Sequence, residues 1–201
     1  MSARLNRNRQ PASRLAGLAV VIAVACSHGM LVYGSVPYAA MVYVGYGLVV
    51  FCALGRIYAT AFVGGFKNQV LITEGPFATI RNPLYFFSLI GIAGVGLTSG
   101  RISIFVLLVG MHLISYHFLI GREEAALDEK FHGAYAAYRT RVPRLLPRLA
   151  LRHTPREVTL QIGPFYSAIR DGSVWFLAFP FFQLIHYLHT VSVLPAWFFL
   201  P

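Results

Sequence analysis

The sequence predicts an all-α integral membrane protein with about five transmembrane helices. Of its 201 residues, 57% are hydrophobic and only 12% are charged, whereas soluble domains carry about 25% charged residues. Four stretches contain no Asp, Glu, Lys or Arg, and together they form more than half of the chain: 15–55, 82–100, 102–121 and 172–201. These observations exclude a soluble globular enzyme, a disordered tail and a disulfide scaffold.

Each charge-free stretch supplies one or two spans, because a bilayer core needs about 20 apolar residues of helix. Proline is tolerated at the start of the third span, and Pro180 and Pro195 are expected to kink the last span or to set its ends. We also expect Gly91, Gly94, Gly96 and Gly110 to bring the two helices of the central hairpin together. The five predicted spans are Leu15–Tyr33, Tyr38–Val63, Asn82–Gly100, Ile102–Ile120 and Val174–Leu200.

The cations orient this set of spans. With the N-terminus in the cytoplasm, all of the 17 Lys and Arg residues except Arg101 fall in the inner segments 1–14, 56–81 and 122–173. The net charge of +10 is therefore read as a topology signal and as attraction to anionic lipid, and nucleic-acid binding is not expected. A cleaved signal ending near Cys26 is an alternative for the first span, and it leaves the later loops on the same sides.

The first patterned cytoplasmic block is Lys67–Tyr85. Thr73–Pro76 reads as a turn, and Asn82-Pro83 begins a membrane helix whose first N–H groups are free to bind an anion. Arg81 adds a cation beside those groups. An interfacial anchor, with Arg and Tyr at headgroup level, is the alternative interpretation.

The second block is Arg122–Pro147, which holds four of the seven acidic residues in the chain. An aromatic stripe with a carboxylate at one end is predicted on one helix face. An amphipathic helix lying on the membrane is the alternative. The stripe consists of Glu124, Leu127, Phe131, Tyr135 and Tyr138.

Together the two blocks resemble the integral membrane methyltransferases related to isoprenylcysteine carboxyl methyltransferase and the phospholipid methyltransferases. The matching motifs are Leu71–Phe77, Arg81–Tyr85, Glu123–Leu127, Tyr135 with Tyr138, and Val142–Pro147. The chain departs from the family pattern at Asn82, where histidine is common, and at His132, which adds one residue after Phe131. Leu119 replaces an arginine that contacts substrate in the isoprenylcysteine branch.

We expect no metal, and the resemblance implies an S-adenosylmethionine pocket at the cytoplasmic membrane face and a lipophilic methyl acceptor. It assigns catalytic roles to Arg81 and Tyr85. Glu124 or His132 would serve as base where the acceptor must lose a proton. The cofactor-binding residues carried over by position are Gln69, Val70, Leu71, Ile72, Phe77, Asn82, Pro83, Leu84, Tyr85 and Glu123.

The predicted organisation has three parts: N-terminal transmembrane helices (1–55), a methyltransferase-like catalytic core (56–147) and a C-terminal extension (148–201). We expect Gly163–Tyr166 and Asp171-Gly172 to form an ordered loop before the last span. His186 and His189, at i and i+3, could face one metal, although polar packing is favoured. Two other functions stay open: an NADPH-dependent membrane sterol or steroid reductase, and a non-catalytic membrane module that retained the motifs.

Overall fold

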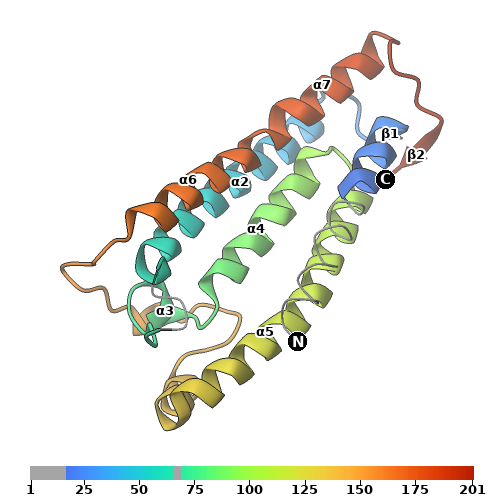
Figure 1. Cartoon of the computed structure of the whole chain (residues 1–201). Coiled ribbons are helices and arrows are strands. Elements are labelled where there is room, and N and C mark those ends of the chain that lie inside the picture. The colour runs from blue at the N-terminus through green and yellow to red at the C-terminus, as the bar shows by residue number, and fades with distance from the viewer. Residues whose placement is uncertain (1–16, 66–68) are drawn as a thin grey trace.

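A computed structural model describes residues 17–65 and 69–201, and these residues are mostly helical (Figure 1). The start of the first predicted span, the N-terminal cations and Lys67 lie outside the described residues. The predicted all-α class is therefore confirmed for the described part of the chain. Its named elements are β1 (Ser27–Gly29), α2 (Val36–Val63), α3 (Pro76–Thr79), α4 (Pro83–Thr98), α5 (Ile102–Arg141), the 3₁₀ helix η1 (Leu149–Leu151), α6 (Ile162–Phe176), α7 (Ala178–Thr190) and β2 (Phe198–Leu200).

Two of the described helices, α2 and α5, are long and apolar enough to cross a membrane, and α4 is apolar but shorter. Large apolar side chains on the outer faces of α2 and α5 are exposed, among them Phe51, Leu54 and Phe118. Such faces suit lipid better than water. The structure thus supports a membrane protein, while the predicted number of five spans is not reproduced.

Helices α2 and α4 approach so closely that their backbones touch. A Cβ atom on Gly45 would lie 2.7 Å from the carbonyl oxygen of Gly94, which leaves room only for glycine. The prediction that four glycines bring the two helices of the central hairpin together is wrong in part. Gly94 packs on α2, and only Gly96 packs on α5, against Phe105, whereas a Cβ atom on Gly110 would have no neighbour within 4 Å among the described residues.

The first predicted span, Leu15–Tyr33, is wrong at its C-terminal end. The described helical residues 17–25 are followed by β1, which pairs in parallel with β2. Arg101 explains this ending, because its Nη2 donates to the carbonyl oxygen of Val24 at 2.9 Å and its Nε donates to Ser27 Oγ at 2.8 Å. A side chain remote in sequence therefore satisfies groups that a longer helix would have paired internally.

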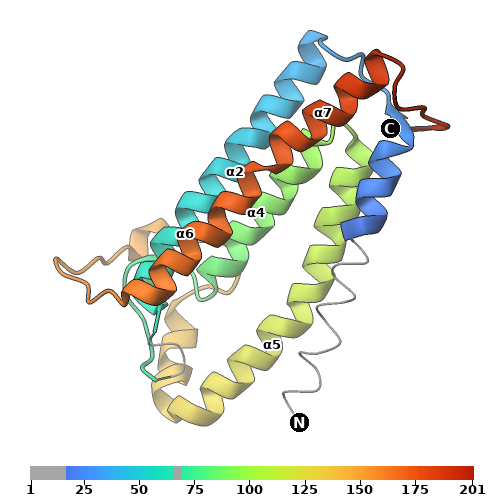
Figure 2. The same ribbon diagram turned by 45° about the horizontal axis from the view of Figure 1, so that its top comes forward.

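The predicted fifth span, Val174–Leu200, is not confirmed with these bounds, because helix ends at Thr190 and β2 follows, and the loop predicted before it is wrong. Helices α6 and α7 run nearly end to end beside α2, as both views show (Figures 1 and 2). Pro180 lacks the N–H that would bond to Phe176, so α6 ends there and α7 begins at Ala178. Gly163–Tyr166 and Asp171-Gly172 lie inside α6, where a Cβ atom on the buried Gly172 would lie 3.7 Å from that of Ala53.

Helix α5 combines two elements that were predicted as separate, the span Ile102–Ile120 and the start of the block Arg122–Pro147. Its 40 residues exceed a bilayer core, so only its apolar first half suits the membrane interior. At His132 the backbone leaves helical geometry, with φ 43° and ψ −126°. This break falls at the residue added after Phe131, and the last turns of α5 then lie close to α3 (Figure 1).

Candidate active site

A cavity of about 350 Å³ opens where the end of α2, the segment 70–85 and helix α5 meet. Nine of the ten predicted cofactor-binding residues line it, and the tenth, Gln69, is exposed and lies outside its lining. The two sequence blocks thus surround one space. The lining consists of Arg56, Val63, Val70, Leu71, Ile72, Phe77, Arg81, Asn82, Pro83, Leu84, Tyr85, Tyr116, Glu123, Ala126, Leu127, Tyr135 and Tyr138.

The first block takes its shape from the predicted turn at Gly75. This residue has φ 59°, a conformation that glycine adopts readily, and its N–H donates to the carbonyl oxygen of His153 at 2.7 Å. Pro76 then starts the short helix α3, and Thr79 Oγ1 donates back to the Pro76 carbonyl oxygen at 2.9 Å. The turn anchors the segment that carries Phe77 and Arg81 to the residues after α5.

The aromatic stripe of the second block packs against this segment. Tyr138 Oη donates to the carbonyl oxygen of Phe77 at 2.7 Å, and Tyr135 and Tyr138 form a buried cluster with Val142, against which Leu127 and Phe131 pack. Tyr138 lies in the last turns of α5, outside the apolar half of the helix. Burial raises the pKa of Tyr138 above its usual value, so the phenol stays protonated and donates at neutral pH.

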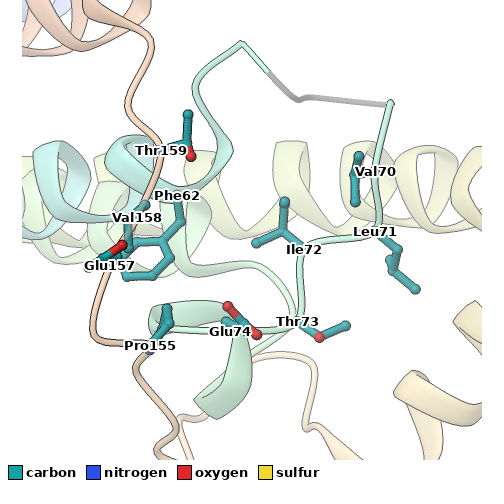
Figure 3. A pocket seen from close by; sticks show the side chains of 10 residues that line it. All are labelled: Phe62, Val70, Leu71, Ile72, Thr73, Glu74, Pro155, Glu157, Val158 and Thr159. Carbon is teal, nitrogen blue, oxygen red and sulfur yellow. The ribbon is translucent and has the colours of Figure 1, made fainter.

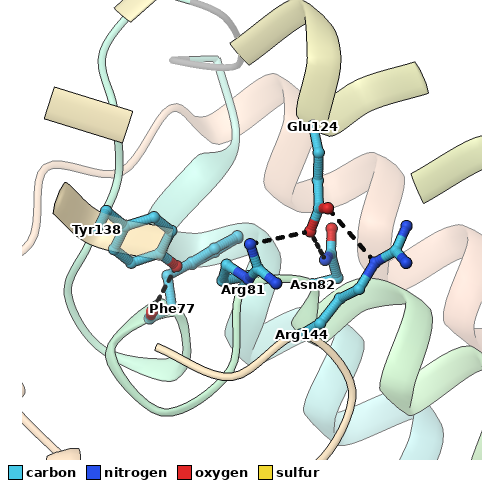
Figure 4. A network of polar contacts seen from close by, with 6 residues as sticks. All are labelled: Phe77, Arg81, Asn82, Glu124, Tyr138 and Arg144. Carbon is cyan, nitrogen blue, oxygen red and sulfur yellow. Dashed lines mark hydrogen bonds and ion pairs between the residues drawn. The ribbon is translucent and has the colours of Figure 1, made fainter. Parts of the chain in front are cut away.

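Glu124 sits at the centre of a polar network beside the cavity (Figure 4). Asn82 Nδ2 donates to Glu124 Oε1 at 3.2 Å. Arg81 Nη1 lies 3.5 Å from the same oxygen, and Arg144 Nε lies 3.3 Å from Oε2. Glu124 itself is not part of the cavity lining. Glu124, which was predicted as a catalytic base, thus contacts Arg81 and Asn82, and these two residues line the cavity.

Arg81 keeps unused hydrogen-bonding capacity. Its side chain is only 11% exposed, and its buried Nε has no hydrogen-bond partner among the described residues. Its backbone N–H donates to the Pro143 carbonyl oxygen at 2.9 Å, which fixes the residue against the second block. A buried, unpaired guanidinium donor at a cavity wall suits an anionic group of a ligand, since such donors are rarely left unsatisfied.

Two lining residues with polar side chains, Arg56 and Tyr116, were not predicted as site residues from the sequence. Arg56 is the only charged residue of α2, and its Nη1 donates to Ser88 Oγ and, at 3.5 Å, to the Leu84 carbonyl oxygen. Tyr116 packs its ring 4.4 Å from that of Tyr85. An ionisable residue inside an apolar helix is a functional candidate by default, and this signal could have identified Arg56.

A second cavity of about 370 Å³ is also lined by the segment Val70–Ile72 (Figure 3). Part of its wall comes from the C-terminal extension, through Pro155 and Glu157–Thr159, and part from Phe62 and Thr73-Glu74. The extension therefore reaches the neighbourhood of the first cavity, with which the second cavity shares three residues.

Comparison with known proteins bears on this site. Residues 38–134 match the phospholipid methyltransferase family, which confirms the resemblance over that range, and the similarity of residues 135–147 stays a prediction. The chain is 33% identical over 124 residues to the cobalt-zinc-cadmium resistance protein CzcN of Cupriavidus metallidurans, covering 62% of this chain and 56% of that protein.

A second relative is the nickel-cobalt-cadmium resistance protein NccN of Alcaligenes xylosoxydans xylosoxydans. It is 31% identical over 139 residues, which cover 69% of this chain and 64% of that protein. The chain thus matches less than two thirds of the length of each of these relatives. No solved structure matches the chain.

Proposed function

Because residues 38–134 belong to the phospholipid methyltransferase family, we propose that the protein transfers a methyl group from S-adenosylmethionine to a lipophilic acceptor. The observation that carries this proposal is the cavity. Nine residues carried over by position from the family resemblance, from two blocks separated by a helical hairpin, line one space of about 350 Å³. Such a space suits a cofactor of this size.

The side chains around the cavity fit the parts of this cofactor. Val70–Ile72 and Phe77 offer apolar and aromatic surface to a purine, and Glu123 offers a carboxylate to hydroxyl or amine donors. Tyr85 offers an aromatic face to a sulfonium cation. The unpaired Nε of Arg81 suits the carboxylate of the amino-acid portion.

When bound, the cofactor supplies a methyl group activated on a positively charged sulfur. The residues of the chain then have three tasks: to hold the donor, to align the acceptor with it and to exclude water. Arg81 and Tyr85 act by contact with the ligands. Glu124 acts as a positioning residue, because its carboxylate is occupied by Arg81, Arg144 and Asn82.

We place the cavity at the cytoplasmic membrane face, on the strength of the cation asymmetry, so that the cofactor arrives from the cytosol. The acceptor arrives from the bilayer, with membrane lipids as the surrounding partners. Arg56, on the otherwise uncharged helix α2, lines the cavity. The second cavity supports a role for the extension in shaping access to the site.

The names of the two relatives suggest a setting. Both are called metal resistance proteins, and we propose that methyl transfer by this chain contributes to such a trait. Neither name states a reaction, so the acceptor does not follow from them.

Ligand-dependent melting of the purified protein tests the proposal, because only a true ligand stabilises by mass action. At one hundred times its Kd, S-adenosylmethionine should add about 2.7 kcal/mol of stability, and NADPH should add none. Glu123→Ala and Tyr85→Ala should each weaken this stabilisation without unfolding the protein, while Glu129→Ala, on the exposed side of α5, should not.

Each other outcome identifies a rival. Stabilisation by NADPH alone would indicate the reductase. No response to either compound would indicate a non-catalytic module. Unchanged affinity in both cavity variants would remove the assignment of the site.

A further inference from the structure

Two histidines meet at the end of the molecule that lies away from the cavity. His28 lies on β1, and His189 lies in the last turn of α7. Both views place β1, β2 and the end of α7 together, at the end opposite α3 (Figures 1 and 2). The ring centres of the two histidines are 5.4 Å apart.

The ring of His189 has one satisfied and one unsatisfied nitrogen. Its Nδ1 lies 3.0 Å from the carbonyl oxygen of Leu194. A carbonyl only accepts, so Nδ1 carries the proton and donates. The lone pair of the neutral ring is then on Nε2, which is buried and has no hydrogen-bond partner among the described residues. A buried polar atom in this state calls for an explanation.

This arrangement is the one that metal-binding histidines use. Such residues almost always donate their second ring N–H to a carbonyl or carboxylate, which orients the other nitrogen toward the ion. Two imidazoles that share one zinc ion, at about 2.0–2.1 Å from each nitrogen, have ring centres on the order of 5 Å apart. The observed separation of 5.4 Å fits this spacing.

The fold fixes the position of His28. Its strand pairs with β2, where it lies opposite Phe199, and the two rings pack with centres 5.6 Å apart. The preceding Ser27 is held by the guanidinium of Arg101. His28 is exposed, so the site lies at the surface of the molecule.

We propose that His28 and His189 bind a divalent transition-metal ion of the kind that prefers imidazole nitrogen, such as zinc, cobalt or nickel. The described residues contain no group of three His, Cys, Asp or Glu side chains suited to one ion. Water therefore fills the remaining positions, and binding is reversible. His186 is not assigned to the site, because its ring packs against those of Tyr33 and Tyr38, with ring centres 6.0 and 5.1 Å away.

Zinc titration of the tag-free full chain in detergent micelles tests this proposal by calorimetry. Wild-type protein should bind one zinc ion per chain, and His28→Ala and His189→Ala should each weaken binding at least tenfold. His153→Ala is the matched control, because it removes an exposed histidine beside the turn at Gly75 and should bind like wild type.

Melting without zinc shows whether each variant is folded. If His189→Ala fails to fold, the result for His28→Ala decides, since this side chain is exposed. Absence of saturable binding to wild type, or wild-type affinity in the folded His28→Ala variant, would overturn the proposal. Because the readout is zinc binding, its failure leaves the proposed methyl transfer unaffected.

Discussion

The two ends of the molecule each contain a buried arginine, and the two side chains differ in how fully they are paired. Arg101 is completely buried, and its three nitrogens all have partners, which come from the first helix, β1 and the turn before α5. Arg81 is 11% exposed at a cavity wall, and its Nε has no partner among the described residues. An arginine whose donors are all hydrogen-bonded stabilises the fold, whereas an arginine with an unpaired donor can still bind a ligand.

The largest effect should follow from Arg101→Ala. The carbonyl oxygens of Val24, Ser27 and Ser99 would lose their donor, and each unsatisfied buried group costs on the order of 1–3 kcal/mol. We expect a loss of about 3–5 kcal/mol in the free energy of unfolding, measured by thermal melting without ligand.

Arg81→Ala is the matched substitution at the other end. It should reduce S-adenosylmethionine affinity at least tenfold and change ligand-free melting far less than Arg101→Ala does. If Arg81→Ala proved the more destabilising of the two in the absence of ligand, the contrast between the two arginines would be wrong.

A smaller effect is expected at Glu124, which acts through Arg81. Glu124→Gln keeps the shape of the side chain but removes the charge that faces Arg81 and Arg144. Cofactor affinity should fall about fivefold, which corresponds to roughly 1 kcal/mol. In an Arg81→Ala background the same substitution should have no further effect on affinity, since coupled residues are not additive. An equal loss in both backgrounds would show that Glu124 does not act by positioning Arg81.

The middle of the fold could be predicted from the sequence, because local signals set its helix ends. The second, third and fourth spans agree with α2, α4 and the first half of α5, which end near prolines, glycines or charges. The ends of the first and last spans were predicted wrongly, because contacts remote in sequence set them. Arg101 terminates the first helix, and packing of Gly172 near Ala53 turns a predicted loop into α6.

The candidate site divides in the same way. Its wall from Val70 to Tyr85 could be read from one contiguous motif, whereas Arg56 and Tyr116 enter from separate helices. The orientation of Glu124 also depends on Arg144, twenty residues further along the chain in a segment that folds back under α4. The residue types indicated which side chains could bind a ligand, but the hydrogen bonds and ion pairs of the fold determine which of them line the cavity.

The smallest expected effect tests whether the role of a residue depends on how fully its side chain is hydrogen-bonded, rather than on where it lies. Tyr138 lines the cavity, yet its hydroxyl is satisfied by the Phe77 carbonyl oxygen at 2.7 Å, so Tyr138→Phe should lower stability by about 1 kcal/mol with little change in cofactor affinity.

Because burial raises the pKa of this phenol in the folded protein, the stability that Tyr138 adds is complete below about pH 10, the pKa of an unfolded tyrosine, and falls at higher pH. Melting of wild type and variant from pH 8 to pH 11 should therefore converge at the alkaline end, and the exposed Tyr166→Phe variant should melt like wild type at pH 8. A large loss of affinity in Tyr138→Phe would mean that even a fully paired group at this end serves the ligand, and the distinction drawn between Arg101 and Arg81 would no longer hold.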